Sequence, residues 1–395
     1  MSSAAPTVVV SSRLFIPEVS AGAFRLGALA EALARRGART TVLTTTPPGH
    51  ASEPHDPAGV TVHRIPVLRD RGGNVRGYLQ YASFDVPLAA RLLRHPADVY
   101  VAESPPTTAL VTASVARMRR KPLVYYAADV WTDGVVAMGA TGAVVSAMRS
   151  MEQRVLRLAS VTLSVSEEVS GRLRDLGAPP ERIVTVGNGI DTSIFRPEGE
   201  IGQRRGRYFV YTGTMSEWQR PDVFLDGFAR IAERFPDVEL RFFGQGALEA
   251  SLRERAEREL PGRVRFGGVV TPARSAEWIR GAQAALVSIF PGIGYDFARP
   301  TKTYAAAACG TPVIFAGART GGEVVRDARL GVAVEFDGAA VAEAMVRILD
   351  DPNGRDAMKS ARAEWARTHV SLDAVGDRAA SAVLGAFQGP TSHGV

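Results

Sequence analysis

The stretch "GNGIDTSIFRPEGEIGQRRGR", residues 187–207, divides the chain into two parts that repeat the same pattern. It is rich in glycine, proline and charged residues, which is typical of a linker. On either side, short β-branched or aromatic runs alternate with stretches of helical periodicity. We therefore predict two domains, and a chain of 395 residues is long enough to form them.

The part before the linker begins with "TVVVSS" (7–12), a strand pattern, followed by the helical pattern "AFRLGALAEALARRG" (23–37) with Gly37 as its stop. Five further runs are strand candidates: "ARTTVLTTT", "VTVHRIP", "ADVYVAES", "PLVYYAADV" and "SVTLSVS". These runs are apolar on both faces and are separated by helices. This pattern predicts a parallel sheet that is covered on both sides.

The pattern restarts after the linker with "YFVYTG" (208–213) and ends in a largely helical tail. We predict an α/β protein with two Rossmann-like, doubly wound parallel-sheet domains that face each other across a cleft. The predicted bounds are 1–195 for the first domain, 196–207 for the linker, 208–370 for the second domain, and 371–395 for a helix that returns to the first domain.

Charge and composition narrow the choice of partners. The net charge is +6, and arginine carries most of the positive charge. We interpret this positive charge as arginines scattered over a solvated surface. The sequence has no module of interleaved basic and aromatic residues that would indicate nucleic-acid binding. The run "ARMRRK" (116–121) fits a solvated face better than a lipid contact, so membrane contact is at most peripheral. The single cysteine, Cys309, excludes a disulfide, and the sequence shows no leader or membrane span. We expect a cytoplasmic protein.

Loops after strands are where such sheets bind ligands, and one of them contains an unusual lysine. Lys302 lies in "FARPTKTYAAAACGTPV" (297–313), at the start of an alanine-rich helix, and is one of only three lysines in the chain. A cation at a helix N-terminus is unfavourable unless an anion is also present. We predict that Lys302 binds a phosphate, the alternative being that it points to water.

Six ordered segments resemble the retaining family 4 glycosyltransferases of GT-B fold. They are "PEVSAGAFRLGALAEALARRGARTTVLT", "VTVGNGIDTSIFRP", "YTGTMSEWQRPDVFLDGFARIAERFPDVELRFFGQG", "RVRFGGVV", "KTYAAAACGTPVIFAG" and, after the first-domain strand "LVYYAA", "DVWTD". The resemblance implies a metal-independent, retaining sugar transfer from a UDP- or GDP-linked donor, which is a co-substrate, without a cofactor. It also implies that the domain 208–370 is a nucleotide-sugar-binding domain and that the domain 1–195 is an acceptor-binding domain. The partners would be a small-molecule donor and acceptor, the acceptor being a glycan precursor or a secondary metabolite.

The resemblance and the post-strand loops together name the candidate site residues. The catalytic candidates are Asp129, Arg220 and Lys302. Donor binding is assigned to Gly22, Gly213, Thr214, Gly244, Gly268, Val269, Asp296, Arg299, Lys302 and Glu323. Acceptor binding is assigned to Arg13, Glu103 and Trp131, and no metal site is expected. Two alternatives stay open, namely that Gly22 is a helix N-cap and that Asp129 caps a helix.

The sequence departs from the family at one place. Most members carry two glutamates around the helix of Lys302, the second of which binds the donor ribose. The corresponding positions here are Phe297 and Ala305. We predict that Asp296 substitutes as the ribose ligand. The absence of both glutamates also leaves a second hypothesis, a non-catalytic sugar-nucleotide-binding homologue that partners an active transferase.

Overall fold

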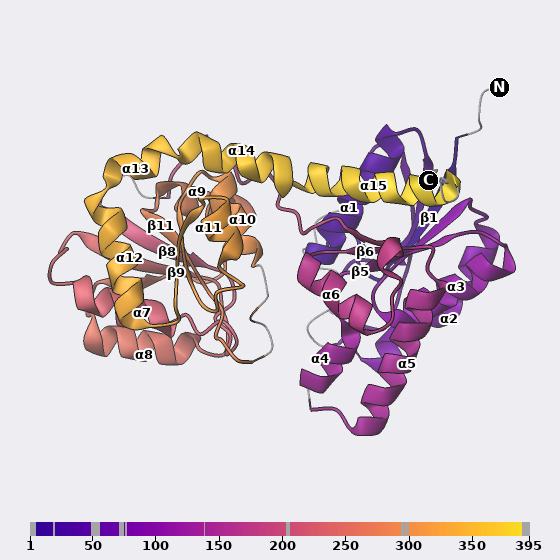
Figure 1. Cartoon of the computed structure of the whole chain (residues 1–395), viewed down its shortest axis with the longest axis horizontal. Helices are drawn as coiled ribbons and strands as arrows, with labels where there is room; N and C mark the ends of the chain where they lie inside the picture. Colours follow the sequence, from indigo (N-terminus) through magenta and orange to yellow (C-terminus); the bar gives the residue numbers. More distant parts are fainter. Residues whose placement is uncertain are drawn as a thin grey trace. The chain divides into compact units, whose positions relative to one another are not determined.

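The computed structural model describes residues 5–18, 20–48, 56–70, 75, 77–137, 139–202, 206–293, 296 and 300–388. The chain forms two compact units. Unit 1 comprises residues 1–189 and 372–395, and unit 2 comprises residues 190–371. Figure 1 shows that each unit is a sheet with helices on both of its faces.

The sheet of unit 1 has seven parallel strands in the order β3-β2-β1-β4-β5-β6-β7. Their bounds are β1 Thr7–Ser11, β2 Arg39–Thr45, β3 Val60–Ile65, β4 Val99–Glu103, β5 Leu123–Ala127, β6 Val161–Ser164 and β7 Ile183–Thr185. Successive residues of β1 point to opposite faces, so Val8 and Val10 join one core cluster and Val9 joins the other.

The helices of unit 1 cover both faces of this sheet. They are α1 Ala21–Arg35, α2 Tyr78–Arg94, α3 Pro106–Met118, α4 Trp131–Ala137, α5 Gly142–Leu158, α6 Glu167–Asp175 and α15 Leu372–Gln388, with a 3-10 turn at Pro180–Arg182. Helices α1 and α15 pack on one face, while α2, α3, α5 and α6 pack on the other. Helix α15 lies along α1 although about 340 residues separate them, as Figure 1 shows.

The sheet of unit 2 has six parallel strands in the order β10-β9-β8-β11-β12-β13. The strands are β8 Arg207–Thr212, β9 Val238–Phe243, β10 Val264–Phe266, β11 Ala284–Ser288, β12 Val313–Ala316 and β13 Gly331–Val334. The helices are α7 Asp222–Ile231, α8 Glu249–Glu259, α9 Pro272–Gly281, α10 Thr301–Ala308, α11 Glu323–Asp327, α12 Gly338–Asp350, α13 Pro352–Ala357 and α14 Lys359–His369.

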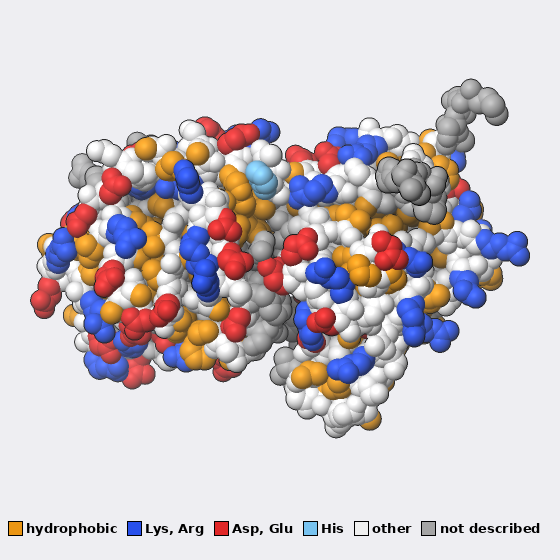
Figure 2. Space-filling view, viewed as in Figure 1, with side chains coloured by type: hydrophobic (Ala, Val, Ile, Leu, Met, Phe, Trp, Pro, Cys, Tyr) orange, Lys and Arg blue, Asp and Glu red, His pale blue; other side chains and the backbone are white. Residues whose placement is uncertain are grey.

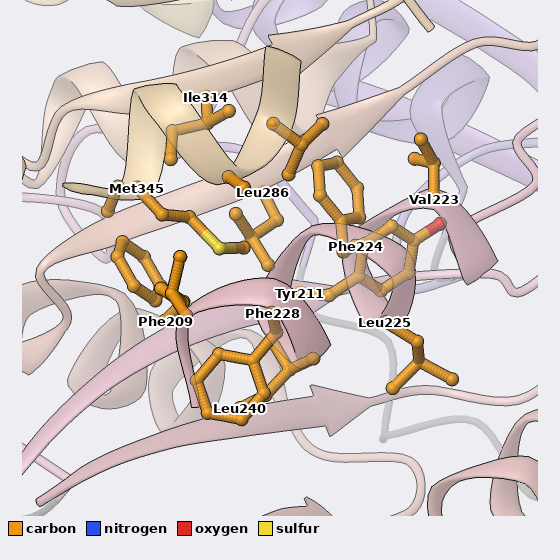
Figure 3. Packing of buried hydrophobic residues seen from close by; sticks show 14 of the residues in the cluster. Phe209, Tyr211, Val223, Phe224, Leu225, Phe228, Leu240, Leu286, Ile314 and Met345 are labelled. Atoms are coloured by element: carbon orange, nitrogen blue, oxygen red, sulfur yellow. The ribbon is translucent and has the colours of Figure 1, made fainter. Parts of the chain in front are cut away.

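The core of unit 2 is aromatic on the face covered by α7, α8 and α12. Figure 3 shows Phe224 and Phe228 of α7 packed against Phe209 and Tyr211 of β8 and against Met345 of α12. All five side chains are buried. This packing holds β8 in place, and the loop that follows β8 is part of the candidate site.

The predicted fold class is confirmed, because both sheets are parallel and both follow the doubly wound Rossmann order. One strand was missed, since "IVT" of β7 is only three residues long and only partly buried at the sheet edge. In each sheet the strand order reverses beside the first strand, between β1 and β4 and between β8 and β11. Ligands of such sheets bind beyond the carboxyl ends of these strands.

The surface carries charges of both signs. Figure 2 shows arginine and lysine side chains interspersed with aspartate and glutamate on the viewed face of unit 2. Many arginines form ion pairs with nearby carboxylates, for example Arg207 with Asp237. No helix within the described ranges is long and apolar enough to span a membrane.

Candidate active site

Lys302 lies in the first turn of α10, where the loop after β11 meets the loop after β8. Its ammonium donates hydrogen bonds to Tyr211 Oη at 2.9 Å and to Gln219 Oε1 at 3.1 Å. The same Nζ lies 4.0 Å from the centre of the Tyr211 ring. Burial lowers the pKa of Lys302 to about 7. Among the described residues no carboxylate forms an ion pair with this ammonium.

An unpaired, buried cation favours an anionic ligand, because the ligand restores the charge interaction that burial removes. The side chains around the ammonium cannot supply that charge. Tyr211 is neutral, since burial raises its pKa, and its hydroxyl lies 2.5 Å from both the Thr214 carbonyl oxygen and Gln219 Oε1. Gln219 is neutral at every pH and is almost fully buried. The geometry therefore holds Lys302 in place without neutralising it.

Three of the four predicted donor-binding glycines, Gly213, Gly244 and Gly268, lie together in the loops after β8, β9 and β10. The Gly213 N–H donates to Phe243 O at 2.8 Å, and the Gly244 N–H donates to Gly268 O at 2.7 Å. Gly213 has φ +128°, and a Cβ there would lie 3.1 Å from Lys302 Nζ. Gly244 has φ +127°, and its Cβ would overlap the Gly213 carbonyl oxygen. Only glycine fits where backbone lies this close to backbone.

Two further donor candidates belong to the same loops. Thr214 Oγ1 lies 3.2 Å from Gln219 Oε1, which links the β8 loop to the lysine network. Val269 follows Gly268, and 67% of its side chain is exposed although it is apolar. An exposed valine beside the glycine loops is available to pack against a flat ligand group.

Arg220 has its own partner. Its Nε and Nη2 donate to the two carboxylate oxygens of Asp222 at 2.9 and 2.8 Å, and its guanidinium lies 5.1 Å from the centre of the Phe290 ring. It lines a pocket of about 650 Å³ together with Trp218 and residues of α8, and Lys302 is not among the lining residues. Arg220 directly follows Gln219 in the sequence. Unlike Lys302, however, its guanidinium pairs with a carboxylate, that of Asp222.

The remaining donor candidates lie around the loop between β11 and α10. Asp296 Oδ1 accepts a hydrogen bond from the Gly292 N–H at 2.8 Å, and the Asp296 carbonyl oxygen accepts one from Thr320 Oγ1 at 2.9 Å. Glu323 begins the short helix α11. Arg299 and Phe297 lie outside the described residues. The Oδ1 oxygen of Asp296 is therefore occupied by a hydrogen bond within the loop between β11 and α10.

In unit 1, Glu103 ends β4 and is buried in a polar network. Ser12 Oγ donates to Glu103 Oε2 at 2.7 Å, and Arg25 Nη2 lies 3.8 Å from Oε1. Arg25 also donates to Asn188 Oδ1 at 2.8 Å. Burial raises the pKa of Glu103, and the charge of Arg25 opposes that rise only in part. This carboxylate joins the loops after β1 and β4 and the end of β7.

The Glu103 carboxylate also explains why residue 22 is a glycine. A Cβ at Gly22 would lie 2.7 Å from Glu103 Oε1. Gly22 is the second residue of α1, whose N-cap is Ser20, with its side chain accepting from the Ala23 N–H. The alternative of Gly22 as the N-cap is therefore wrong.

The other predicted acceptor residues meet through a tyrosine that sequence analysis missed. The Arg13 guanidinium lies 3.9 Å from the centre of the Tyr81 ring, and Tyr81 packs edge-on against Trp131 with ring centres 6.0 Å apart. The buried Arg13 Nε and Trp131 Nε1 have no hydrogen-bond partner among the residues that the structure describes. Asp129 precedes Trp131 by two residues and is exposed. This stack places the partly buried rings of Tyr81 and Trp131 beside the Arg13 guanidinium.

A buried glutamate, also missed, positions Trp131. Glu152 of α5 is fully buried, and its carboxylate accepts hydrogen bonds from the Trp131 and Thr132 N–H groups, both at 2.9 Å, and from Thr132 Oγ1 at 2.6 Å. It therefore caps the N-terminus of α4. The signal in the sequence is a glutamate at a core position of an otherwise amphipathic helix, in register with Met148 and Val155.

Replacing Glu152 by alanine should lower the free energy of unfolding of unit 1 by about 3 kcal/mol, because three buried donors lose a charged acceptor. Glu152→Gln, which keeps one carbonyl acceptor, should lose less. Urea unfolding, with hydrogen exchange of the Trp131 and Thr132 amides, measures both variants. Equal stability of Glu152→Ala and wild type would show that α4 does not depend on this cap.

Comparisons with known proteins identify the family and the fold. A model described as a glycosyl transferase 4-like domain matches residues 21–189, and one described as glycosyl transferases group 1 matches residues 206–351. Relatives include D-inositol 3-phosphate glycosyltransferase 2 of Catenulispora acidiphila, 30% identical over 231 residues that cover 52% of each chain. The D-inositol 3-phosphate glycosyltransferase of Thermomonospora curvata is 28% identical over 250 residues, 56% of each chain. The chain thus spans about half the length of these relatives.

Solved structures share the fold over nearly the whole chain. The Anabaena protein Alr3699/HepE in complex with UDP has a TM-score of 0.70 at 15% identity, covering 96% of this chain and 100% of that chain. A glycosyltransferase from Rickettsia africae has a TM-score of 0.71 at 12% identity, covering 98% and 100%. Two Rossmann-like domains with these neighbours define a GT-B glycosyltransferase fold. With the two family models matching in order over most of its length, the chain belongs to the family 4 glycosyltransferases.

Among the described residues, no group of three or more histidine, cysteine, aspartate or glutamate side chains could hold a metal ion. Lys302 is a buried cation at the switch point of unit 2. A buried ammonium can stabilise negative charge on a phosphate.

Proposed function

We propose that this chain transfers a sugar, with retention and without a metal, from a nucleotide diphosphate donor bound by unit 2 to an acceptor bound by unit 1. The observation that carries the proposal is the Lys302 ammonium, buried at the N-terminus of α10 and without a carboxylate partner among the described residues. A donor diphosphate supplies the missing charge, and N–H groups at the N-terminus of α10 supply hydrogen bonds.

In this mechanism the leaving nucleoside diphosphate gains charge in the transition state, and Lys302 stabilises it. The backbone of the Gly213 loop borders Lys302 Nζ closely, since a Cβ at Gly213 would lie 3.1 Å from it. The donor is UDP- or GDP-linked, and the UDP complex of the Anabaena structural neighbour supports the former. No cofactor is required, because the donor is a co-substrate.

The acceptor is bound by the stack of Arg13, Tyr81 and Trp131, and Asp129 orients the transferred sugar or a hydroxyl of the acceptor. Sugar rings stack on aromatic faces, and Tyr81 and Trp131 are only partly buried. The acceptor is a glycan precursor or a secondary metabolite. The relatives named for D-inositol 3-phosphate support a hydroxyl-rich small acceptor.

A second candidate is a sugar-nucleotide-binding homologue without catalysis. Ala305, at the position of the family's ribose-binding glutamate, is buried in the core cluster that contains α10. The loss of that carboxylate favours this candidate, unless Asp296 replaces it through its second oxygen.

Donor hydrolysis without acceptor separates the two candidates. Purified protein is incubated with UDP- and GDP-linked sugars in the presence of a chelator, and release of the nucleoside diphosphate is measured. Slow release that depends on the chain supports the transferase. Binding of a nucleotide without release from any donor supports the non-catalytic homologue, and neither binding nor release contradicts both.

The affinity for UDP should fall as the pH rises above about 7.5. In the free protein Lys302 has a pKa of about 7, so above this pH it is mostly neutral and must take up a proton to pair with the diphosphate. The affinity then falls by up to about tenfold for each pH unit, until the pH reaches the pKa that Lys302 has in the complex with UDP. Calorimetry between pH 7.5 and 9.5 measures this slope. Lys302→Met should bind weakly at every pH in this range, and a slope equal to that of wild type would assign the proton to another group.

A further inference from the structure

Helix α2 is apolar on both of its faces. From Gly77 to Leu93 its only charged side chains are Asp85 and Arg91, and both are buried. A surface helix of a globular domain ordinarily has one apolar and one charged face. The outward face of α2 therefore lacks the charges that keep a helix in water.

The inward face of α2 is fixed to unit 1. Phe84, Leu88 and Leu92 are fully buried in the core between α2 and the sheet. Arg91 donates to Thr44 O at 3.3 Å and to His63 O at 2.6 Å, which binds the helix to β2 and β3. The orientation of α2 is thus set by packing and hydrogen bonds, and its other face is left outside.

The outward face of α2 consists of Leu79, Ala82, Val86, Ala90 and Leu93, all exposed. Their spacing of three or four residues places them on one side of the helix. Leu79 is 73% exposed, Val86 is 75% exposed and Leu93 is 44% exposed. Leu68, which is also exposed, adjoins α2 through the hydrogen bond from its N–H to Ser83 Oγ. Contiguous apolar surface of this kind marks an interaction site.

One end of this face is bordered by arginines. Arg119 Nη2 donates to Leu93 O at 2.6 Å, so the C-terminal ends of α2 and α3 lie side by side. Arg94, Arg117 and Arg120 at these ends are exposed, and no ion pair neutralises them within the described part of the chain. Met118, between them, is 63% exposed.

Acidic side chains are nearly absent from this surface. Between residues 77 and 121 the acids are Asp85 and Glu103, which are buried, and Asp98, which pairs with Lys121. The surface thus offers apolar side chains and uncompensated arginine charge together. This combination complements a bilayer with anionic headgroups, in which a helix lies along the boundary between headgroups and acyl chains.

We propose that the outward face of α2, with Arg94, Arg117 and Arg120, docks this protein onto the surface of an anionic lipid bilayer. Leu79, Val86 and Leu93 enter the boundary between headgroups and acyl chains, and the arginines pair with the phosphates. The inference rests on α2 and α3 alone and holds whether or not the chain transfers a sugar.

Flotation of the full chain with vesicles tests the proposal. The protein should float with vesicles of equimolar phosphatidylglycerol and phosphatidylcholine, float much less with phosphatidylcholine alone, and detach as salt is raised. The combined Leu79→Gln, Val86→Gln and Leu93→Gln variant should lose at least about tenfold in partitioning. The combined Arg94→Gln, Arg117→Gln and Arg120→Gln variant should lose a similar factor and most of its salt dependence.

Ile201→Gln is the matched control, because Ile201 is an exposed apolar residue in unit 2. It should float like wild type, and all variants should keep the wild-type circular dichroism, since the changed side chains face outward. Failure of wild type to float with anionic vesicles would overturn the proposal. The proposal would also be overturned if the combined Leu79→Gln, Val86→Gln and Leu93→Gln variant floated as well as wild type. A further contradicting result would be that wild type does not float and instead forms a dimer, seen by light scattering, that only this variant loses.

Discussion

Lys302→Met is expected to lower the rate of donor turnover by about a hundredfold or more, the effect typical of removing one group that stabilises transition-state charge. The methionine retains most of the apolar stem but removes the ammonium that donates to Tyr211 Oη and Gln219 Oε1. The loss should appear in the rate at saturating donor as well as in donor affinity. Rates of nucleoside diphosphate release, measured over a range of donor concentrations, give both quantities.

Two variants make this result specific. Lys359→Met removes the charge of a lysine at the start of α14, exposed in the same unit, and should turn over like wild type. Lys302→Arg keeps the charge but should not restore the rate, because a planar guanidinium does not fit between Tyr211, Gln219 and Gly213. Unchanged kinetics in Lys302→Met would remove this lysine from the mechanism.

Gly244→Ala is expected to destabilise unit 2 by about 3 kcal/mol or more and to abolish nucleotide binding. The new Cβ would overlap the Gly213 carbonyl oxygen, and φ +127° is a conformation that alanine strongly disfavours. To relieve the overlap the Gly213 loop must move, and this loop borders the Lys302 ammonium. Thermal unfolding and UDP titration measure the two effects.

Gly262→Ala is the matched control for backbone strain. Gly262 also has positive φ, at +74°, but a Cβ there meets nothing within 4 Å. It should cost only about 1–2 kcal/mol and leave UDP binding intact. If Gly244→Ala were no less stable than Gly262→Ala, the close packing of the three loops would not constrain the site.

The fold was predictable because each strand of a doubly covered parallel sheet is apolar on both faces. "TVVVSS" and "YFVYTG" both have this character, and each is followed by a loop and a helical pattern. Strand β7 escaped because three partly buried residues at a sheet edge carry too little apolar pattern. A local sequence pattern does not predict a strand that forms only because it pairs with a neighbouring strand.

The site was predictable in part. Lys302 is detectable because a lone lysine in the first turn of a helix is electrostatically unfavourable without an anion. The partners of Lys302 are not detectable in the sequence, because Tyr211 and Gln219 lie more than 80 residues earlier in the chain. In addition, Tyr211 looks like an ordinary residue of a strand. Contacts set by strand order, such as β8 beside β11, are invisible to local patterns.

The loop glycines and Arg220 show a different limit. Gly213, Gly244 and Gly268 were selected for ligand contact, yet the structure also requires them where one loop packs on the next. Arg220 was selected as a catalytic cation, whereas its guanidinium forms two hydrogen bonds to Asp222 in the structure. Residue type and loop position do not distinguish a free cation from one that is paired two residues away.

The central claim is that Lys302 marks a nucleotide diphosphate site in unit 2, and calorimetric titration of UDP and GDP at pH 7 tests it most directly. The account predicts saturable binding of at least one nucleotide to wild type and to Lys359→Met, and at least about tenfold weaker binding to Lys302→Met. Binding of equal strength to Lys302→Met, or no binding of either nucleotide to wild type, would contradict it.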